Sequence, residues 1–246
     1  MKKTYSFDIN GFITEAAYEE NCVEDIFLPL LHRWTALYRQ KQRRILVFLS
    51  APPGTGKTTA CRFLEYLSRL QPDTESIQSI GLDGFHYTAA YIARHTVTVN
   101  GTEVPMQSVK GSPETFDLIK LTEKLAALKT GDVLWPIYDR NLHDVVEDAV
   151  SVTANIVLLE GNWLLSAEPR WRELIDLCDD SVFIAAKKED LRERLVRRKM
   201  AGGLCREEAE RFFVNSDGKN VDRLMSCRHP AGIELIMDAD GNYRKP

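Results

Sequence analysis

The stretch Ile45-Leu-Val-Phe-Leu-Ser-Ala-Pro-Pro-Gly-Thr-Gly-Lys-Thr-Thr59 decides the fold. Its first five residues are apolar and are bounded by charge on one side and by proline and glycine on the other. This pattern predicts a short, buried strand of a parallel sheet. The residues that follow, up to about Leu70, predict a helix. A strand, a glycine-rich turn and a helix therefore follow one another directly, which is the context that a phosphate-binding loop requires.

Residues 51–58 fit the P-loop pattern, with alanine in place of the first glycine. Backbone N–H groups of such a loop surround a phosphate, and the following helix directs its positive end at the same charge. Lys57 is expected to reach the β- and γ-phosphates, and Thr58 to offer its hydroxyl to Mg²⁺. The alternative is a glycine-rich turn with a surface lysine. The expected ATP-binding residues are Ala51, Pro52, Pro53, Gly54, Thr55, Gly56, Lys57, Thr58 and Thr59.

The composition excludes several classes of protein. The 246 residues are 44% hydrophobic and carry a net charge of −4, so no domain-wide positive field exists to bind nucleic acid. The five cysteines are scattered and form no Cys-x-x-Cys pair, which predicts free thiols in a reducing compartment. No apolar stretch is long enough to cross a membrane. We therefore expect a cytoplasmic protein with no membrane partner.

Strands alternate with helices along the chain, which predicts the α/β fold of the P-loop NTPases, a mostly parallel sheet with helices on both faces. Residues 1–246 are interpreted as one domain, and residues 11–40 as an N-terminal helix. Asn100-Gly101, flanked by 96–99 and 102–104, is typical of a type I′ hairpin and predicts a small β-hairpin insertion at 96–104. The remaining strands are expected at 77–82, 133–137, 156–159, 182–185 and 233–237, and helices at 112–131, 170–178, 190–200 and 207–215.

A carboxylate follows the second expected strand, in Leu82-Asp-Gly-Phe-His86. The carboxyl ends of parallel strands line the ligand crevice of an open sheet. Asp83 could therefore accept the proton of an attacking hydroxyl or orient it. The alternative is an aspartate that only caps the turn before Gly84.

Five segments in a fixed order resemble the uridine kinase, phosphoribulokinase and bacterial pantothenate kinase group of P-loop kinases. Within this group the chain is most similar to bacterial nucleoside/nucleotide kinase-like proteins, some of them named as fructose-transport-system kinases. The resemblance covers Arg44 to about Met237. The matching segments are Ala51 to Thr58, Leu82 to His86, Lys110-Gly-Ser-Pro-Glu-Thr-Phe-Asp117, Pro136-Ile-Tyr-Asp-Arg140 with His143, and Leu159-Glu-Gly-Asn-Trp163.

The resemblance implies roles for residues on the acceptor side. Asp83 takes the place of the catalytic aspartate, and Glu160 that of a carboxylate near Mg²⁺. The alternative for Glu160 is a structural carboxylate at a strand end, and for His143 a surface histidine. The residues assigned to the substrate are Asp83, His86, Lys110, Tyr138, Arg140 and His143.

The densest basic stretch contains Arg194, Arg197 and Arg198, which are spaced so that they share a helix face. Such a face could clamp phosphates in the transition state, as part of a helical lid at about 187–216. Ala201-Gly202-Gly203 could be its hinge. The alternative is a solvated helix face on which glutamates and aspartates pair with the arginines.

Together these observations predict a kinase that uses ATP and Mg²⁺ to phosphorylate a hydroxyl group of a small molecule. A sugar such as a ketose is the first candidate acceptor, and a nucleoside or a pantothenate-like compound the second. No set of residues that reads a uracil base is recognisable. A P-loop ATPase or a regulatory nucleotide-binding protein is the alternative of another class, and a homodimer is left open.

Overall fold

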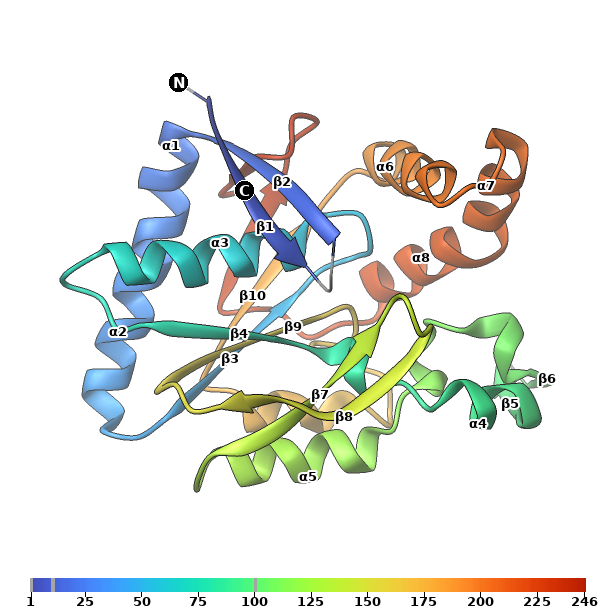
Figure 1. The fold of residues 1–246 in the computed structure, drawn as a ribbon, viewed down its shortest axis with the longest axis horizontal. Helices are drawn as coiled ribbons and strands as arrows, with labels where there is room; N and C mark the ends of the chain where they lie inside the picture. Colours follow the sequence, from blue (N-terminus) through green and yellow to red (C-terminus); the bar gives the residue numbers. More distant parts are fainter. Residues whose placement is uncertain (1, 10–11, 100) are drawn as a thin grey trace. The chain divides into compact units, whose positions relative to one another are not determined.

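The computed structural model describes residues 2–9, 12–99 and 101–246 (Figure 1). The sequence analysis treated the chain as one domain, whereas its internal contacts divide it into two compact units. The sheet unit comprises residues 1–80 and 154–246, and the inserted unit comprises residues 81–153. Among the described residues, no helix combines the length and the apolar character that a membrane span needs.

The sheet unit is built on six strands in the order β12-β11-β10-β3-β9-β4. The central strand β3 pairs in parallel with β9 and β10, and β10 pairs in parallel with β11, while β12 runs antiparallel to β11. Every residue of β3 and β9 is buried, as expected for strands covered on both faces. The mostly parallel sheet is confirmed. The strands are β3 (Ile45–Ser50), β4 (Ile77–Gly81), β9 (Ile156–Gly161), β10 (Asp180–Ala185), β11 (Ile233–Met237) and β12 (Tyr243–Arg244).

Helices of the sheet unit bury one face each. Trp34 of α2 and Phe63 of α3 are fully buried in the main core, and Leu191 and Leu195 of α6 join the same core. The helices are α1 (Glu20–Cys22), a π-helix (Val23–Phe27), α2 (Leu28–Lys41), α3 (Lys57–Leu70), α6 (Lys188–Ala201), α7 (Arg206–Phe212), a second π-helix (Phe213–Asp217) and α8 (Gly218–Ser226). The helices expected at 190–200 and 207–215 are therefore present, whereas the one expected at 170–178 is a 3-10 helix (Arg172–Leu177).

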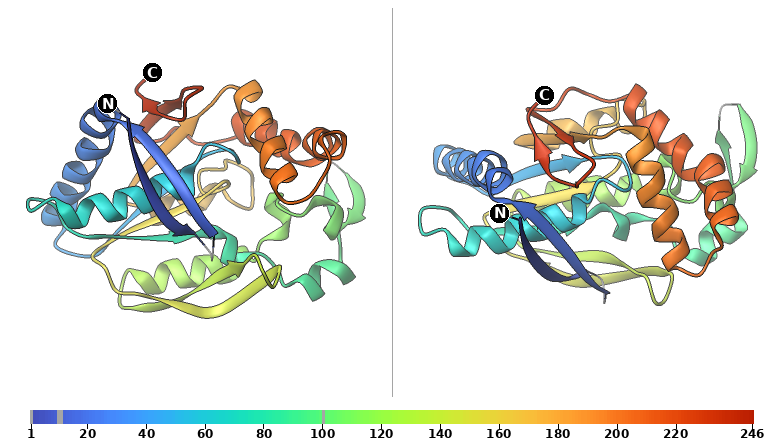
Figure 2. Two further views of the ribbon diagram at one scale, coloured as in Figure 1. Left: turned by 45° about the horizontal axis from the view of Figure 1, so that its top comes forward. Right: turned by 90° about the horizontal axis from the view of Figure 1, so that it is seen from above.

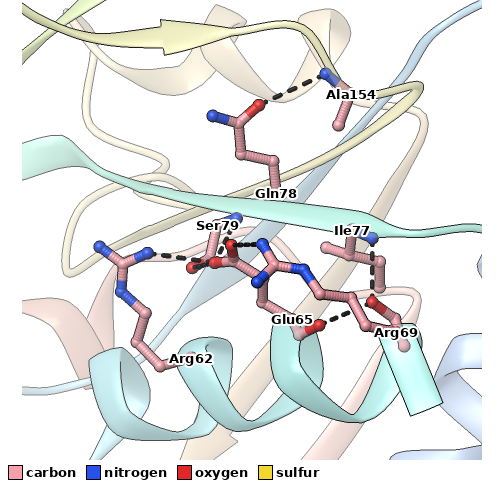
Figure 3. Close-up of polar contacts among 8 residues, drawn as sticks. Arg62, Glu65, Arg69, Ile77, Gln78, Ser79 and Ala154 are labelled. Carbon is pink, nitrogen blue, oxygen red and sulfur yellow. Dashed lines mark hydrogen bonds and ion pairs between the residues drawn. The ribbon is translucent and has the colours of Figure 1, made fainter. Parts of the chain in front are cut away.

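The buried carboxylate of Glu65 joins α3 to strand β4 (Figure 3). The Glu65 carboxylate accepts hydrogen bonds from the hydroxyl of Ser79 at 2.6 Å and from its backbone N–H at 3.2 Å. The same carboxylate pairs with Arg62 at 3.1 Å and with Arg69 at 2.5 Å. This network anchors the helix that follows the P-loop to the edge of the sheet.

The prediction of a helix over residues 11–40 is wrong for its first part. Residues Lys2–Ile9 (β1) and Phe12–Glu19 (β2) form an antiparallel hairpin, and helical structure begins only at Glu20. Tyr5 and Phe7 alternate along β1 and pack against Phe63 of α3, at ring-centroid distances of 4.7 and 6.5 Å. Burial of this aromatic face outweighs the weak helical pattern. Figure 2 shows β2 near β12, where the Glu19 N–H donates to Asn242 Oδ1 at 3.0 Å.

The inserted unit contains two antiparallel hairpins and two short helices. The hairpin predicted at 96–104 is confirmed as β5 (Thr96–Val99) and β6 (Thr102–Pro105), although Asn100 lies outside the described residues. A second hairpin, β7 (Val133–Asp139) with β8 (Asp144–Val152), was predicted only in its first strand. The remaining elements are the 3-10 turn Leu82–Phe85, α4 (Ala89–Arg94), 3-10 helices at Met106–Val109 and Pro113–Thr115, and α5 (Leu118–Leu128).

The helix predicted to open at Ser112 begins six residues later, at Leu118. Its N-cap is Asp117, whose carboxylate accepts a hydrogen bond from the N–H of Lys120 at 3.0 Å. Pro113–Thr115 forms a separate 3-10 turn instead. Aspartate at an N-cap satisfies an N–H group that the first turn leaves unpaired, and this cap decides where the helix starts.

Candidate nucleotide and acceptor sites

The P-loop follows β3 directly and depends on two glycines in the left-handed region. Gly54 has φ +90° and Gly56 has φ +78°, conformations that other residues rarely adopt. A Cβ atom at Gly54 would lie 3.1 Å from Cγ of Leu195, so this glycine is also required for close packing against α6. The loop is therefore fixed both by its backbone and by a neighbouring helix.

The first turn of α3 has no side-chain cap. Gly56 is the N-cap and supplies no side-chain acceptor, and the first helical hydrogen bond is from Ala60 N–H to the Gly56 carbonyl at 2.9 Å. The N–H groups of residues 57–59 precede that bond and have no partner within the helix. Within the described parts of the chain, Lys57 forms no hydrogen bond or ion pair either. N–H groups and an ammonium group are thus free to bind phosphates.

Two oxygen ligands lie together beside this helix start. The Thr58 hydroxyl donates a hydrogen bond of 2.8 Å to Oε1 of Glu160, at the carboxyl end of β9. Glu160 is opposite Leu49 in the register of β3 and β9, so the parallel pairing itself brings it to the P-loop. A hydroxyl and a carboxylate suit Mg²⁺, which takes oxygen ligands and retains waters and substrate phosphates. Among the described residues, no cluster of three His, Cys, Asp or Glu side chains could hold a metal by itself.

The three predicted clamp arginines have different surroundings. Nη2 of Arg194 lies 3.6 Å from the position of a Cβ at Gly56, so this guanidinium is beside the P-loop. Arg197 is 75% exposed and pairs with Glu193 at 2.8 Å, which matches the alternative of a solvated helix face. Arg198 lies near Asp217. Burial raises the pKa of Asp217, and the positive charges of Lys199 and Arg198 oppose this rise in part. The helical segment is confirmed, whereas its role as a lid stays a prediction.

The sequence analysis missed Tyr243 as a residue of the phosphate site. Its buried hydroxyl donates a hydrogen bond of 2.8 Å to the backbone carbonyl of Thr55, within the P-loop. The two residues are 188 positions apart. Nothing in the local sequence around Tyr243 indicates this contact.

In the inserted unit, Asp83 is exposed on the 3-10 turn Leu82–Phe85. Its carboxylate has no hydrogen-bond partner among the described residues. The turn has a fixed shape because a Cβ at Gly84 would lie 2.1 Å from the backbone oxygen of Pro136. Glycine is therefore obligatory after Asp83, and the alternative of an aspartate that caps this turn is not supported by any cap hydrogen bond of its side chain.

His86 is held by residues of the segment 110–117. Its ring stacks on Phe116 at 3.8 Å, and Nδ1 lies 3.2 Å from the Thr115 carbonyl oxygen. Burial lowers the pKa of His86, Lys110 lowers it further, and the carboxylate of Asp83 opposes both effects. The imidazole is therefore neutral near pH 7. With Nδ1–H donating to the carbonyl, its Nε2 is a hydrogen-bond acceptor.

Lys110 and Tyr138 are also brought to this cluster. The Lys110 ammonium donates a hydrogen bond of 2.7 Å to the Tyr138 hydroxyl, and the Tyr138 ring lies edge-on to His86 at 6.0 Å. Arg140 and His143 lie on the connection between β7 and β8 instead, both exposed. His143 has φ +54°, a turn conformation that histidine tolerates better than most residues. Neither makes a hydrogen bond or ion pair within the described chain.

A parallel sheet whose central strand leads into a glycine-rich loop and a helix, with a threonine hydroxyl beside a strand-end glutamate, defines a P-loop protein, and the relatives of the chain show that it is a kinase. The comparisons with known proteins agree. A solved structure from Silicibacter sp. TM1040, named "putative fructose transport system kinase", is 28% identical and superposes with a TM-score of 0.72 over 83% of this chain and 98% of its own. The pantothenate kinase of Halalkalibacterium halodurans is 27% identical over 87% of this chain and 80% of its own length.

A third relative shows the family. The protein named "Uncharacterized protein YggC" of Escherichia coli K12 is 44% identical over 236 residues, which are 96% of each chain. The chain belongs to the YggC family. No protein-family model matches it. The P-loop kinase class inferred from the sequence is thus confirmed, and its acceptor is the subject of the next subsection.

Proposed function

We propose that the protein transfers the γ-phosphate of ATP, bound with Mg²⁺, to a hydroxyl group of a small polar metabolite, with a sugar as the first candidate. The observation that carries the phosphate side is the contact of 2.8 Å between the Thr58 hydroxyl and Glu160. It brings a hydroxyl from α3 and a carboxylate from β9 together beside the uncapped N–H groups at the start of α3. Such a set suits a nucleotide with its metal better than a free anion.

On the phosphate side, Thr58 and Glu160 would hold Mg²⁺, which neutralises charge on the β- and γ-phosphates. The N–H groups at the start of α3 and the Lys57 ammonium bind the phosphate oxygens. Arg194 adds a positive charge beside Gly56, where charge spreads over the transferring group.

On the acceptor side, Asp83 accepts the proton of the attacking hydroxyl. The acceptor oxygen forms a bond to the γ-phosphorus, the bond from that phosphorus to the bridging oxygen breaks, and ADP leaves with the electron pair. Neutral His86 accepts a hydrogen bond through Nε2, while Lys110 and Tyr138 donate hydrogen bonds that orient the acceptor. The Asp83 carboxylate makes no hydrogen bond with the described residues, so it is available to the acceptor hydroxyl.

A sugar fits this set because it presents several hydroxyl groups and an apolar ring face. The cluster offers the acceptor nitrogen of His86, the Lys110 ammonium, and both the hydroxyl and the aromatic ring of Tyr138. The similarity to the Silicibacter protein, at 28% identity, also supports a sugar.

A pantothenate-like acceptor is the second candidate. Arg140 is exposed and has no partner in the described chain, so it could bind a carboxylate on the acceptor. The relative from Halalkalibacterium halodurans carries the name pantothenate kinase. A nucleoside ranks behind both, because no group that reads a base is recognisable.

The test is ADP release by the purified protein with Mg-ATP across sugars, sugar phosphates, nucleosides and pantothenate. We expect stimulation by one class of compound, and loss of that stimulation by a factor of about 10³ in Asp83→Asn. Asp73→Asn is the matched control, because Asp73 is exposed in the sheet unit and its carboxylate makes no hydrogen bond or ion pair with the described residues. ATP turnover that is indifferent to every compound and to Asp83→Asn would contradict the proposal and favour an ATPase or a regulatory role.

A further inference from the structure

The P-loop is contacted by a tyrosine from a distant part of the sequence. Tyr243 of β12 is 4% exposed, and its hydroxyl donates a hydrogen bond of 2.8 Å to the Thr55 carbonyl. Its ring packs edge-on against Phe27 at 5.8 Å, and its backbone N–H donates to Sγ of Cys22 at 3.3 Å. The hydroxyl is therefore directed at the loop from a ring and a backbone that are both fixed.

This hydrogen bond fixes the direction of a second group. The carbonyl of Thr55 and the N–H of Gly56 belong to one trans peptide unit, so they point in opposite directions. A carbonyl held toward Tyr243 directs the Gly56 N–H to the other side of the loop. Gly56, on one side of this peptide unit, has no side chain to restrict its backbone. On the other side the buried hydroxyl of Thr55 donates a hydrogen bond of 2.9 Å to the Pro52 carbonyl, so the bond from Tyr243 adds a restraint on the carbonyl itself.

The hairpin that carries Tyr243 also lies beside Arg194. Its turn is closed by hydrogen bonds from Asp238 N–H to the Asn242 carbonyl at 3.0 Å and from Asn242 N–H to Asp238 Oδ1 at 2.9 Å. Within this turn Gly241 has φ +84°, and a Cβ there would lie 3.0 Å from Nη1 of Arg194. The guanidinium thus lies between the turn and Gly56 of the P-loop.

We propose that Tyr243 is a positioning residue of the phosphate site: its hydroxyl holds the Thr55–Gly56 peptide so that the Gly56 N–H faces the bound phosphate, and the turn before it keeps Arg194 beside the loop. The inference rests on the proposed function, which assigns the phosphates to this loop. Burial raises the pKa of Tyr243 well above that of a free phenol, against the smaller effect of Arg194, so the hydroxyl remains a donor at neutral pH.

The experiment measures the binding of Mg-ADP and of inorganic tripolyphosphate by calorimetry to the wild type, Tyr243→Phe and Tyr18→Phe. Tyr18 is the matched control, because it is also 4% exposed and its hydroxyl hydrogen-bonds to Tyr243 rather than to the loop. Both variants keep the ring and lose one buried hydroxyl. We expect Kd for both probes to rise about tenfold in Tyr243→Phe, the effect of one hydrogen bond, and to stay within about twofold in Tyr18→Phe.

The outcomes separate this inference from the proposed function. Wild-type affinity in Tyr243→Phe, or an equal loss in both variants, would overturn the positioning role while leaving a working kinase site. Failure of the wild type to bind either probe would contradict the proposed function, and the inference with it.

A second variant covers the possibility that Tyr243→Phe does not fold. Gly241→Ala lies in the turn and places a methyl group against Arg194. We expect it to raise Kd for tripolyphosphate about fivefold, since the guanidinium is displaced from the loop. An unchanged Kd in the folded Gly241→Ala protein would overturn the part of the inference that concerns Arg194.

Discussion

The phosphate side of the sheet unit and the acceptor cluster of the inserted unit are built in opposite ways. Around the P-loop, the backbone is fixed by packing and by hydrogen bonds, including the Thr55 carbonyl held by Tyr243, while Lys57 and the N–H groups at the start of α3 stay available to a ligand. In the inserted unit, Asp83, Arg140 and His143 are exposed, and their side chains have no partner within the described chain. Under the proposed function, the loop that binds phosphate is therefore shaped before the nucleotide binds, whereas the exposed residues of the inserted unit would be ordered by the acceptor itself.

Lys57→Met is expected to have the largest effect on kcat, and it changes the P-loop without changing the inserted unit. Loss of the ammonium removes charge stabilisation in the transition state, and kcat should fall by about 10³. The acceptor cluster should be unaffected, so binding of the acceptor found in the panel should change little. Calorimetry measures the binding of that acceptor, and steady-state kinetics measure the fall in kcat. A Lys57→Met protein that loses acceptor binding as strongly as turnover would contradict the division between the two regions.

Arg194→Ala and Arg197→Ala form the next comparison, on one helix. Arg194 is beside Gly56, and we expect kcat to fall by about 10² when it is removed. Arg197 pairs with Glu193 at the surface, and its removal should change kcat by less than about twofold and the free energy of unfolding by less than about 1 kcal/mol. Equal kinetic effects of the two variants would argue for a lid on which both arginines act.

Glu65→Ala tests how the contact between α3, the helix that starts at the P-loop, and strand β4 contributes to stability. It removes the acceptor of two hydrogen bonds from Ser79 and the partner of Arg62 and Arg69. We expect a loss of about 1–3 kcal/mol in the free energy of unfolding, because the buried Ser79 N–H is left unpaired, with the arginine contacts discounted for their exposure. Urea unfolding measures it, with exposed Glu123→Ala as the control. A normal kcat at low temperature should accompany the loss. A large kinetic defect would mean that phosphate binding depends on this network.

The smallest expected effect is a dependence of the free energy of unfolding on pH, and it arises from His86 in the inserted unit. The pKa of His86 is lowered in the folded protein, chiefly by burial, so between its folded pKa and about 6.5 the unfolded chain binds a proton that the folded chain does not. The free energy of unfolding should therefore decrease as the pH falls below about 6.5, by at most about 1.4 kcal/mol per pH unit for one proton. In His86→Gln this slope should be smaller. Identical pH dependence in the two proteins would remove the support for a neutral His86.

The sequence predicted those features that depend on neighbouring residues. The strand, P-loop and helix at 45–70 form one contiguous motif, and the hairpin at 96–104 follows from its Asn-Gly turn. Asn10-Gly11, in the sequence between β1 and β2, is the same dipeptide. The apolar residues from Val23 to Tyr38 recur with a helical period, and the predicted helix extends this period too far towards the N-terminus. The strand, in which side chains alternate with a period of two, ends at Glu19, and the helical period begins at Glu20.

The sequence could not predict contacts that depend on tertiary structure. Arg194, Arg197 and Arg198 are equivalent in their spacing, and only the packing of α6 against Gly54 selects Arg194 for the P-loop. Tyr243 reaches Thr55 because β11 pairs with β10 and β10 with β3, a chain of pairings that no local pattern records. The acceptor residues were found by resemblance, and their assignment to the substrate stays a prediction.

The hydrogen bond of 3.3 Å between Ala154 N–H and Gln78 Oε1 joins the two points at which the sheet unit is interrupted (Figure 3). The chain leaves the sheet unit after β4 and returns to it through the neighbouring strand β9, so both ends of residues 81–153 connect to adjacent strands of one sheet. Two adjacent strands of one sheet can accept an insertion of different length and shape between them, because the rest of the sheet keeps its pairing. The inserted unit could therefore be exchanged in evolution while the P-loop and the sheet that carries it are kept.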